Sequence, residues 1–155
     1  AASDVYKRQR IDEKIKGAMQ PENAEKILIV DDEKDIRKLV GIYLKRQGYQ
    51  ILEAENGKQA IDLVRENSDI DLIIMDIMMP VMDGLTATRA IRALERADAK
   101  TIPIIAMTAN AFSEDIQHSL AAGMNAHVSK PVEMKVLEKT IRSIKSGGGH
   151  RNAAH

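Results

Sequence analysis

Short apolar runs that alternate with segments of helical periodicity are the feature that most constrains the fold of this chain. The runs are rich in Ile, Leu and Val and lack the strict apolar–polar alternation of a strand with one solvated face. They are therefore typical of strands covered on both faces, as in a parallel sheet. They are KILIV (26–30), YQILEA (49–54), DLIIMD (71–76), TIPIIAM (101–107) and AHVS (126–129).

Residues spaced three and four positions apart predict a helix after each of these runs. Gly48 and Gly123 follow the first and fourth helices as stops, Asn56 marks the entry to the second, and Asp83 is an N-cap candidate for the third. Five βα units in series predict an α/β fold, a flavodoxin-like, doubly wound parallel sheet of strand order 2-1-3-4-5 with helices on both faces. The positions that define the five helices are Ile36, Leu39, Val40, Tyr43 and Leu44; Ala60, Ile61 and Val64; Leu85, Thr88, Ile91 and Leu94; Ile116 and Leu120; and Val136, Leu137, Ile141 and Ile144.

Length and local composition predict one domain between two terminal extensions. The chain has 155 residues, which suits a single compact domain. Residues 1–25 are polar and are expected to form an extension or linker, for which a short helix over 9–19 and disorder are both open. Residues 146–155 are expected to form a flexible Gly-rich tail. The function should therefore reside in a domain over 26–145.

The composition excludes several classes of function. Basic and acidic residues number 23 each, so the chain has no electrostatic footprint for nucleic acid or for an anionic membrane. The absence of cysteine excludes disulfides, thiolate metal sites and a cysteine nucleophile. No apolar run approaches the roughly 20 residues that span a bilayer, and the N-terminus lacks the apolar centre of a signal peptide. We expect a cytoplasmic domain that contacts neither nucleic acid nor membrane, with a core that is mainly aliphatic because only four residues are aromatic.

Acidic residues directly follow two of the predicted strands. The run ILIV leads into Asp31 and Asp32, and the run LIIM leads into Asp76. Because the first and third strands are neighbours in the predicted order, the three carboxylates should meet beyond the carboxyl ends of the strands, where such sheets bind ligands. Two like charges 4 Å apart cost about 4 kcal/mol at an effective dielectric near 20, so a proton or a cation must relieve the repulsion. Ligand sets made only of oxygen favour Mg²⁺, with Mn²⁺ as the alternative.

Two further residues at strand ends predict chemistry on a phosphoryl group. The fourth strand ends at Thr108, and the fifth ends at Lys130, which precedes Pro131. A cation, an ammonium group, a hydroxyl and a central carboxylate together suit phosphoryl transfer, with Asp76 as a nucleophile that forms an acyl phosphate. Each residue alone has a simpler explanation as a helix cap, a structural hydroxyl or a surface charge. Their joint placement at four strand ends favours the functional interpretation.

The methionines and one histidine of the central region are interpreted as structural. His118 is expected on a solvated helix face and is not expected to be phosphorylated. Met75, Met78, Met79 and Met82 are interpreted as packing residues without a functional role.

The segments ILIVDDE, LIIMDIMMPVMDG, PIIAMTAN and HVSKP occur in an order and spacing that resemble the receiver domain of bacterial two-component response regulators. The resemblance runs from about Lys26 to Ile144. The stretches MTANAF and AGMNAHVSKP are most similar to receivers attached to hybrid histidine kinases.

The resemblance implies a role for each residue of the site. Asp76 matches the phosphoacceptor, and Asp31 and Asp32 match the acidic pair that holds Mg²⁺ together with Asp76 and the main-chain carbonyl of Met78. Thr108 matches the hydroxyl that moves onto the phosphoryl oxygen during switching. Lys130 matches the lysine that pairs with the phosphoryl group, and the Lys130–Pro131 bond is expected to be cis.

One position departs from the family, because His127 stands where the rotating switch residue is often Tyr or Phe. The resemblance implies a module that takes a phosphoryl group from the phosphohistidine of a histidine kinase or a histidine phosphotransfer domain. Such a module is not an enzyme in the usual sense, although it catalyses its own phosphorylation and dephosphorylation. The resemblance is also compatible with a homodimer through the fourth and fifth helices.

Three alternatives fit the sequence less well. A phosphatase of the haloacid-dehalogenase type needs a second Asp two residues after the nucleophile, where this chain has Met78. A Rossmann or P-loop nucleotide-binding domain needs a Gly-rich loop after the first strand, where this chain has DDEKD. A receiver-like scaffold that acts without phosphorylation usually loses part of the acidic set, which is complete here.

Overall fold

Strands and helices alternate along the chain in a computed structural model, which describes residues 24–109 and 113–146. The described residues form β1 (Lys26–Val30), α2 (Lys34–Arg46), β2 (Gln50–Ala54), α3 (Gly57–Glu66), β3 (Ile70–Asp76), α4 (Gly84–Arg92), β4 (Ile104–Thr108), α5 (Ser113–Ala122), β5 (Ala126–Ser129) and α6 (Met134–Ser146).

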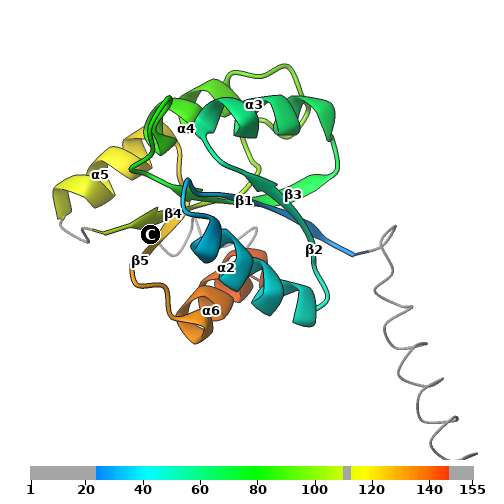
Figure 1. The fold of residues 1–155 in the computed structure, drawn as a ribbon. Coiled ribbons are helices and arrows are strands. Elements are labelled where there is room, and N and C mark those ends of the chain that lie inside the picture. The colour runs from blue at the N-terminus through cyan, green and yellow to red at the C-terminus, as the bar shows by residue number, and fades with distance from the viewer. Residues whose placement is uncertain (1–23, 110–112, 147–155) are drawn as a thin grey trace, which may run out of the picture.

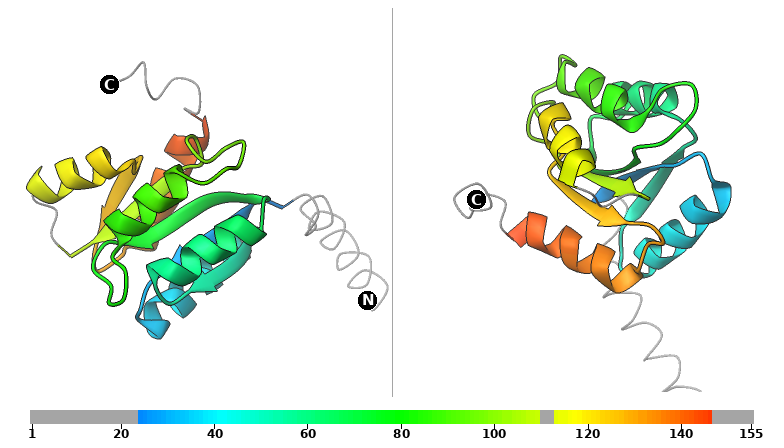
Figure 2. Two further views of the ribbon diagram at one scale, coloured as in Figure 1. Left: turned by 90° about the horizontal axis from the view of Figure 1, so that it is seen from above. Right: turned by 90° about the vertical axis from the view of Figure 1, so that its left-hand side faces the viewer.

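The strands form one parallel sheet in the order β2-β1-β3-β4-β5, which confirms the predicted topology. Figure 1 shows α3, α4 and α5 on one side of this sheet and α2 and α6 on the other. In Figure 2 the helices α3, α4 and α5 lie side by side, with α4 in the middle. The sheet is therefore buried on both faces, as its apolar strands require.

Each face of the sheet has its own aliphatic core. Alternate residues of β1 point to opposite faces: Leu28 and Val30 pack against α3 and α4, whereas Ile27 and Ile29 pack against α2 and α6. All four side chains are almost completely buried. Burial of an aliphatic side chain of this size stabilises the fold by about 1.5 to 3 kcal/mol. The largest fully buried side chains are all Ile, Leu or Met, as the scarcity of aromatic residues predicts.

Local signals set the helix ends. Asn56 accepts a hydrogen bond from the backbone N–H of Gln59, and Asp83 accepts one from Thr86, so both predicted helix starts are confirmed. Gly48 has a φ of +100°, a conformation that favours glycine, and it follows the end of α2. The start of α2 differs from these two, because Glu33 at its N-cap makes no side-chain capping bond.

Some predicted boundaries are wrong by a few residues. The fourth strand begins at Ile104 instead of residue 101, because the N–H groups of Thr101 and Ile102 bond to the carbonyl of Asp98 in a turn. Pro103, directly before the strand, has no backbone N–H and cannot donate a hydrogen bond to a neighbouring strand. The last helix extends through Ser146, which the sequence places in the tail. The helix considered over 9–19 lies outside the described residues.

Three residues of the predicted apolar helix faces are exposed to solvent, whereas an apolar face is expected to be buried against the sheet. They are Leu39 on α2, Leu120 on α5 and Val136 on α6.

No helix within the described parts of the chain is long and apolar enough to span a membrane.

Candidate functional site

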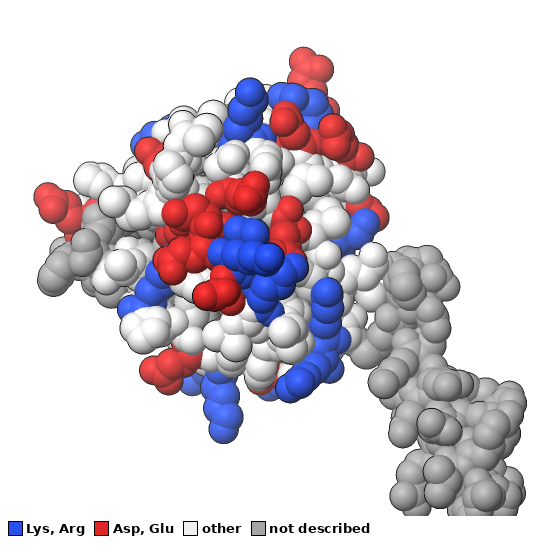
Figure 3. Space-filling model, viewed as in Figure 1, with Lys and Arg blue, Asp and Glu red and all other residues white. Residues whose placement is uncertain are grey.

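Three carboxylates meet at the carboxyl edge of the sheet. Asp31 and Asp32 follow β1, and Asp76 ends β3, the strand paired with β1. One oxygen from each side chain lies within 4.8 Å of the others, which confirms that the three residues share one pocket. Asp31 and Asp76 are buried, whereas Asp32 is exposed. Figure 3 shows acidic side chains gathered beside the start of α2, around a group of basic ones, although the net charge of the chain is zero.

Lys130 brings the fifth strand to this cluster. Its Nζ lies 3.0 Å from Oδ2 of Asp31, 3.2 Å from Oδ2 of Asp76 and 3.9 Å from Oε1 of Glu33. The backbone N–H of Lys130 donates to the carbonyl of Thr108 at 2.8 Å, so the ends of β4 and β5 are joined. Thr108 is buried, and the peptide bond between Lys130 and Pro131 is cis. The structure thus brings together the residues that the sequence singles out at the four strand ends.

The cluster perturbs its own ionisation. Burial and, to a smaller extent, the charge of Asp31 raise the pKa of Asp76 to about 6, although Lys130 offsets part of their effect. For Lys130, burial lowers the pKa, but the hydrogen bonds and charges of Asp31 and Asp76 outweigh burial and leave it above its ordinary value. One ammonium group therefore does not fully compensate the buried carboxylates.

The acidic cluster fits a hard divalent cation. Oδ2 of Asp31 is buried and, apart from its ion pair with Lys130, accepts no hydrogen bond from the described residues. Asp31 shares this ammonium group with Asp76, so a bound cation would give its carboxylate a second positive partner. The cluster offers only oxygen ligands, which Mg²⁺ and Mn²⁺ prefer in proteins.

The loop between β3 and α4 is tightly folded next to Asp76. A Cβ atom at Gly84 would lie 2.2 Å from the carbonyl oxygen of Asp76, so only glycine allows this approach. Val81 has a φ of +71°, and the N–H of Met82 bonds to the carbonyl of Pro80 across it, which is a strained γ-turn. Nothing in the sequence marks Val81 as the residue with a positive φ.

The methionines divide into two groups. Met75 and Met79 are buried, as expected for packing residues. Met78 is different, because its side chain is 75% exposed and the packing interpretation is wrong there. Its backbone N–H donates to Oδ1 of Asp76 at 3.2 Å, which keeps the Met78 main chain beside the cluster.

The two histidines of the described region lie apart from the acidic cluster. His127 is half-buried on β5, the edge strand, where it pairs with Ala106. His118 is exposed on α5, as predicted.

Sequence reasoning missed Arg37, which contacts the main chain of the acidic loop. Its Nη1 donates to the carbonyl of Asp31 at 2.7 Å, and its Nε donates to Oε1 of Glu53 at 3.0 Å. A signal was present, because Arg37 lies three and seven residues before Val40 and Leu44, on the buried face of α2.

Comparison with known proteins agrees with this geometry. Residues 27–142 match the family model of the response regulator receiver domain. The chain belongs to this family. It is 38% identical over 123 residues to hybrid signal transduction histidine kinase I of Dictyostelium discoideum and 39% identical over 115 residues to the sensor histidine kinase RcsC of Escherichia coli. These matches cover 77% and 74% of this chain but only 7% and 12% of the two kinases.

Solved receiver structures also resemble this receiver. One is the receiver domain of sensor histidine kinase PA1611 from Pseudomonas aeruginosa, with a magnesium ion coordinated in its active site cleft. It is 36% identical, with a TM-score of 0.69, over 76% of this chain and 94% of that one. Another is the receiver domain of Ssk1 from Saccharomyces cerevisiae, crystallised with the histidine phosphotransfer protein Ypd1. The match is 26% identical, with a TM-score of 0.72, over 82% of this chain and 92% of that one.

Proposed function

We propose that this receiver accepts a phosphoryl group from a phosphohistidine onto Asp76. In this step the P–N bond of the phosphohistidine breaks and an O–P bond forms at the Asp76 carboxylate, while the imidazole, protonated on its other ring nitrogen, leaves as a neutral base. The observation that carries the proposal is the buried carboxylate of Asp76 at the edge of the sheet, where it shares the Lys130 ammonium group with Asp31. A pKa of about 6 leaves this carboxylate mostly ionised at neutral pH, as a nucleophile requires.

Asp31, Asp32, Asp76 and the main-chain carbonyl of Met78 would hold Mg²⁺, with Mn²⁺ as a substitute. When bound, the ion would neutralise part of the negative charge on the carboxylates and on the transferring group. The magnesium site in the PA1611 receiver supports this assignment. Lys130 would pair with a phosphoryl oxygen, and the hydroxyl of Thr108 would donate to another.

The partner of this chemistry would be a histidine kinase or a histidine phosphotransfer domain in the cytoplasm. The hybrid kinases among the relatives and the Ypd1–Ssk1 complex support this class of partner. We also propose that the domain catalyses its own phosphorylation and dephosphorylation without acting on other substrates. The exposed Leu120 and Val136 support a homodimer through α5 and α6.

Intact mass spectrometry tests the phosphoacceptor. With Mg²⁺ and acetyl phosphate, the protein should gain one phosphoryl group, and Asp76→Asn should abolish the gain because the nucleophilic carboxylate is lost. Asp83→Asn is a matched control, since it removes a carboxylate that only caps α4 and should leave the gain intact. If Asp76→Asn gains the same mass at the same rate, the assignment of Asp76 is wrong.

Calorimetric titration tests the cation site separately. Mg²⁺ should bind weakly to the parent protein, and Asp32→Ala should bind it at least roughly tenfold more weakly, because a direct ligand is removed. The same variant should unfold at no lower urea concentration without metal, since Asp32 is exposed in an acidic cluster. Unchanged Mg²⁺ affinity in Asp32→Ala would remove this residue from the site.

A further inference from the structure

The loop that carries the acidic pair is not held in place by the usual helix cap. Glu33 precedes α2 without a side-chain capping bond, although Asn56 and Asp83 cap the next two helices. The N–H of Glu33 bonds instead to Oδ1 of Asp31 at 2.9 Å, which orients that carboxylate within the loop. The direction of the Asp31 main chain must therefore be fixed by contacts from outside the loop.

Two contacts from outside fix this main chain. The N–H of Asp31 donates to the carbonyl of Ala54 at 3.1 Å, and its own carbonyl accepts the Nη1 of Arg37 at 2.7 Å. The first bond continues the pairing of β1 with β2. The second comes from the first turn of α2 and is buried, since Arg37 is only 8% exposed.

Arg37 is itself held by Glu53, near the end of β2. The guanidinium Nε donates to Oε1 of Glu53 at 3.0 Å, while Lys38 bonds to the other oxygen of the same carboxylate at 3.0 Å. Burial raises the pKa of Glu53, but the hydrogen bonds from Lys38 and Arg37 outweigh burial and leave it below its ordinary value. Glu53 thus provides Arg37 with a charged anchor that is fixed to the sheet.

We propose that Arg37 is a positioning residue for the cation site, which it serves by holding the main chain of Asp31 through an anchor on Glu53. The inference rests on the proposed function, because it assigns Arg37 to the same Mg²⁺ site. The guanidinium donates to the main-chain carbonyl of Asp31, so the side-chain carboxylate of Asp31 remains available to bind a cation together with Asp32 and Asp76. Residues that orient ligands in this way typically affect metal affinity by 10- to 100-fold.

Electrostatics alone predicts the opposite sign for the loss of Arg37. A positive charge near three carboxylates repels a divalent cation, so its removal should strengthen binding if charge were the whole effect. If Arg37 positions the loop, its removal should weaken binding, since the Asp31 carbonyl loses its donor and the carboxylates lose their arrangement. The direction of the change therefore distinguishes the two roles.

Calorimetric titration with Mg²⁺ on the full chain provides the measurement. Arg37→Gln should bind Mg²⁺ roughly tenfold more weakly than the parent protein, and Arg37→Lys should lie between them because it keeps one donor. Lys38→Gln is the matched control, since it removes a positive charge from the same helix and the same Glu53 carboxylate but does not contact Asp31. Its Mg²⁺ affinity should be unchanged or slightly higher.

A second variant keeps the test informative if Arg37→Gln does not fold. Arg37→Lys keeps the positive charge but loses the guanidinium that reaches both Asp31 and Glu53, so charge alone predicts unchanged Mg²⁺ affinity, whereas the positioning role predicts weaker binding. Urea denaturation verifies that each variant is folded. A folded Arg37→Gln that binds Mg²⁺ as tightly as the parent protein, or more tightly, overturns the positioning role alone. If the parent protein itself binds no Mg²⁺, the proposed cation site fails and this inference fails with it.

Discussion

At the scale of the single residue, the buried carboxylate of Asp76 is the proposed phosphoacceptor, and its ionised form lowers the stability of the metal-free fold. Its pKa is about 6 in the folded state against an ordinary value of 3.8, mainly because it is buried and next to Asp31. Between these pH values the folded state binds the proton more tightly than the unfolded state. The free energy of unfolding of the metal-free protein should therefore fall as the pH rises from about 4 to 6, and the full penalty should remain above pH 6.

Asp76→Asn should relieve this penalty. We expect the variant to be more stable than the parent protein by roughly 1 to 2 kcal/mol at pH 8 in a metal chelator, after allowance for screening by water, and little different at pH 4. Urea denaturation at the two pH values provides the measurement. Asp83→Asn should show no comparable gain, because Asn caps a helix as well as Asp does. Equal stability of Asp76→Asn and the parent protein at pH 8 would contradict the prediction.

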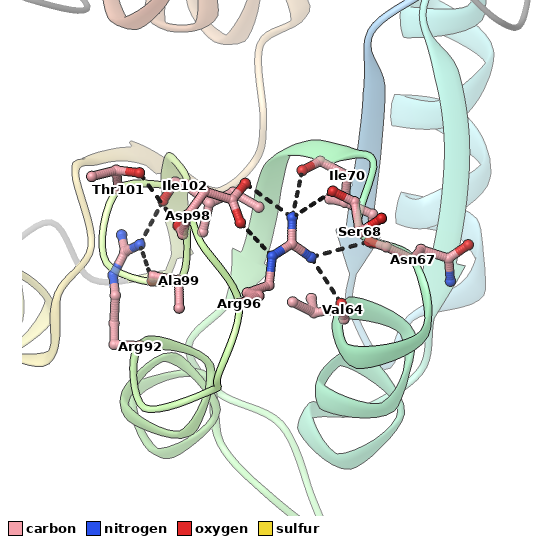
Figure 4. Close-up of polar contacts among 10 residues, drawn as sticks. All are labelled: Val64, Asn67, Ser68, Ile70, Arg92, Arg96, Asp98, Ala99, Thr101 and Ile102. Carbon is pink, nitrogen blue, oxygen red and sulfur yellow. Dashed lines mark hydrogen bonds and ion pairs between the residues drawn. The ribbon is translucent and has the colours of Figure 1, made fainter.

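At the scale of elements, Arg92, the last residue of α4, and Arg96, in the segment that follows it, hold the loops beside the sheet. Figure 4 shows Arg92 and Arg96 pointing to separate groups of carbonyl oxygens. Arg96 pairs with Asp98 and donates to four carbonyls from the last turn of α3 to the first residue of β3, those of Val64, Asn67, Ser68 and Ile70. Arg92 donates to the carbonyls of Ala99, Ile102 and Gly123 and to Oδ1 of Asn125. α4 is thereby tied to the turn at the end of α5.

Arg92→Gln should destabilise the protein strongly. A shorter neutral side chain cannot reach all three carbonyls, and each buried carbonyl that loses its donor costs about 1 to 3 kcal/mol. We therefore expect a loss of roughly 3 kcal/mol in the free energy of unfolding. Arg89→Gln, at an exposed position on the same helix, should change it by less than about 0.5 kcal/mol. Similar urea midpoints for the two variants would show that the contacts of Arg92 do not stabilise the fold.

The sequence predicts the elements better than the contacts that join them. Strand runs and the caps at Asn56 and Asp83 depend on neighbours within a few positions, so their signals are local. Arg92 and Arg96 bond to main-chain carbonyls up to 31 residues away, and every residue type has such a carbonyl, so the sequence does not indicate which ones are bound. The spacing of Leu120 predicts its helix but not its exposure, because spacing alone does not show how much of a helix face is covered.

At the scale of the whole molecule, topology made the site predictable. The order 2-1-3-4-5 brings the ends of β1 and β3 together, so the meeting of Asp31, Asp32 and Asp76 follows from the strand assignment. The role of Arg37 and the strained γ-turn at Val81 did not follow, since they depend on the exact path of two loops. Topology places residues at an edge of the sheet, whereas local packing decides how each one is held.

Phosphorylation should shift the whole domain only in part. A phosphoryl group adds about −1.5 to −2 charge at the end of β3. Moving a two-state equilibrium from 1:99 to 99:1 needs about 5.5 kcal/mol, and one hydrogen bond to a charged group supplies only about 1.5 to 3 kcal/mol. A partner that binds the active state should therefore complete the shift.

This shift should depend more on Thr108 than on His127. Thr108 lies at the end of β4, and its carbonyl accepts a hydrogen bond from the N–H of Lys130. A displacement of Thr108 toward the phosphoryl group should therefore also move the residue that follows β5. His127 lies three residues before Lys130 on the edge strand, outside the acidic cluster.

NMR spectra of Thr108→Ala and His127→Ala, recorded with and without phosphorylation, compare the two roles. Thr108→Ala should lose most of the chemical-shift response across 113–130, and His127→Ala should retain it. The reverse result would assign the switch to His127, and loss of phosphorylation itself in Thr108→Ala, seen by intact mass, would place Thr108 in the transfer step instead.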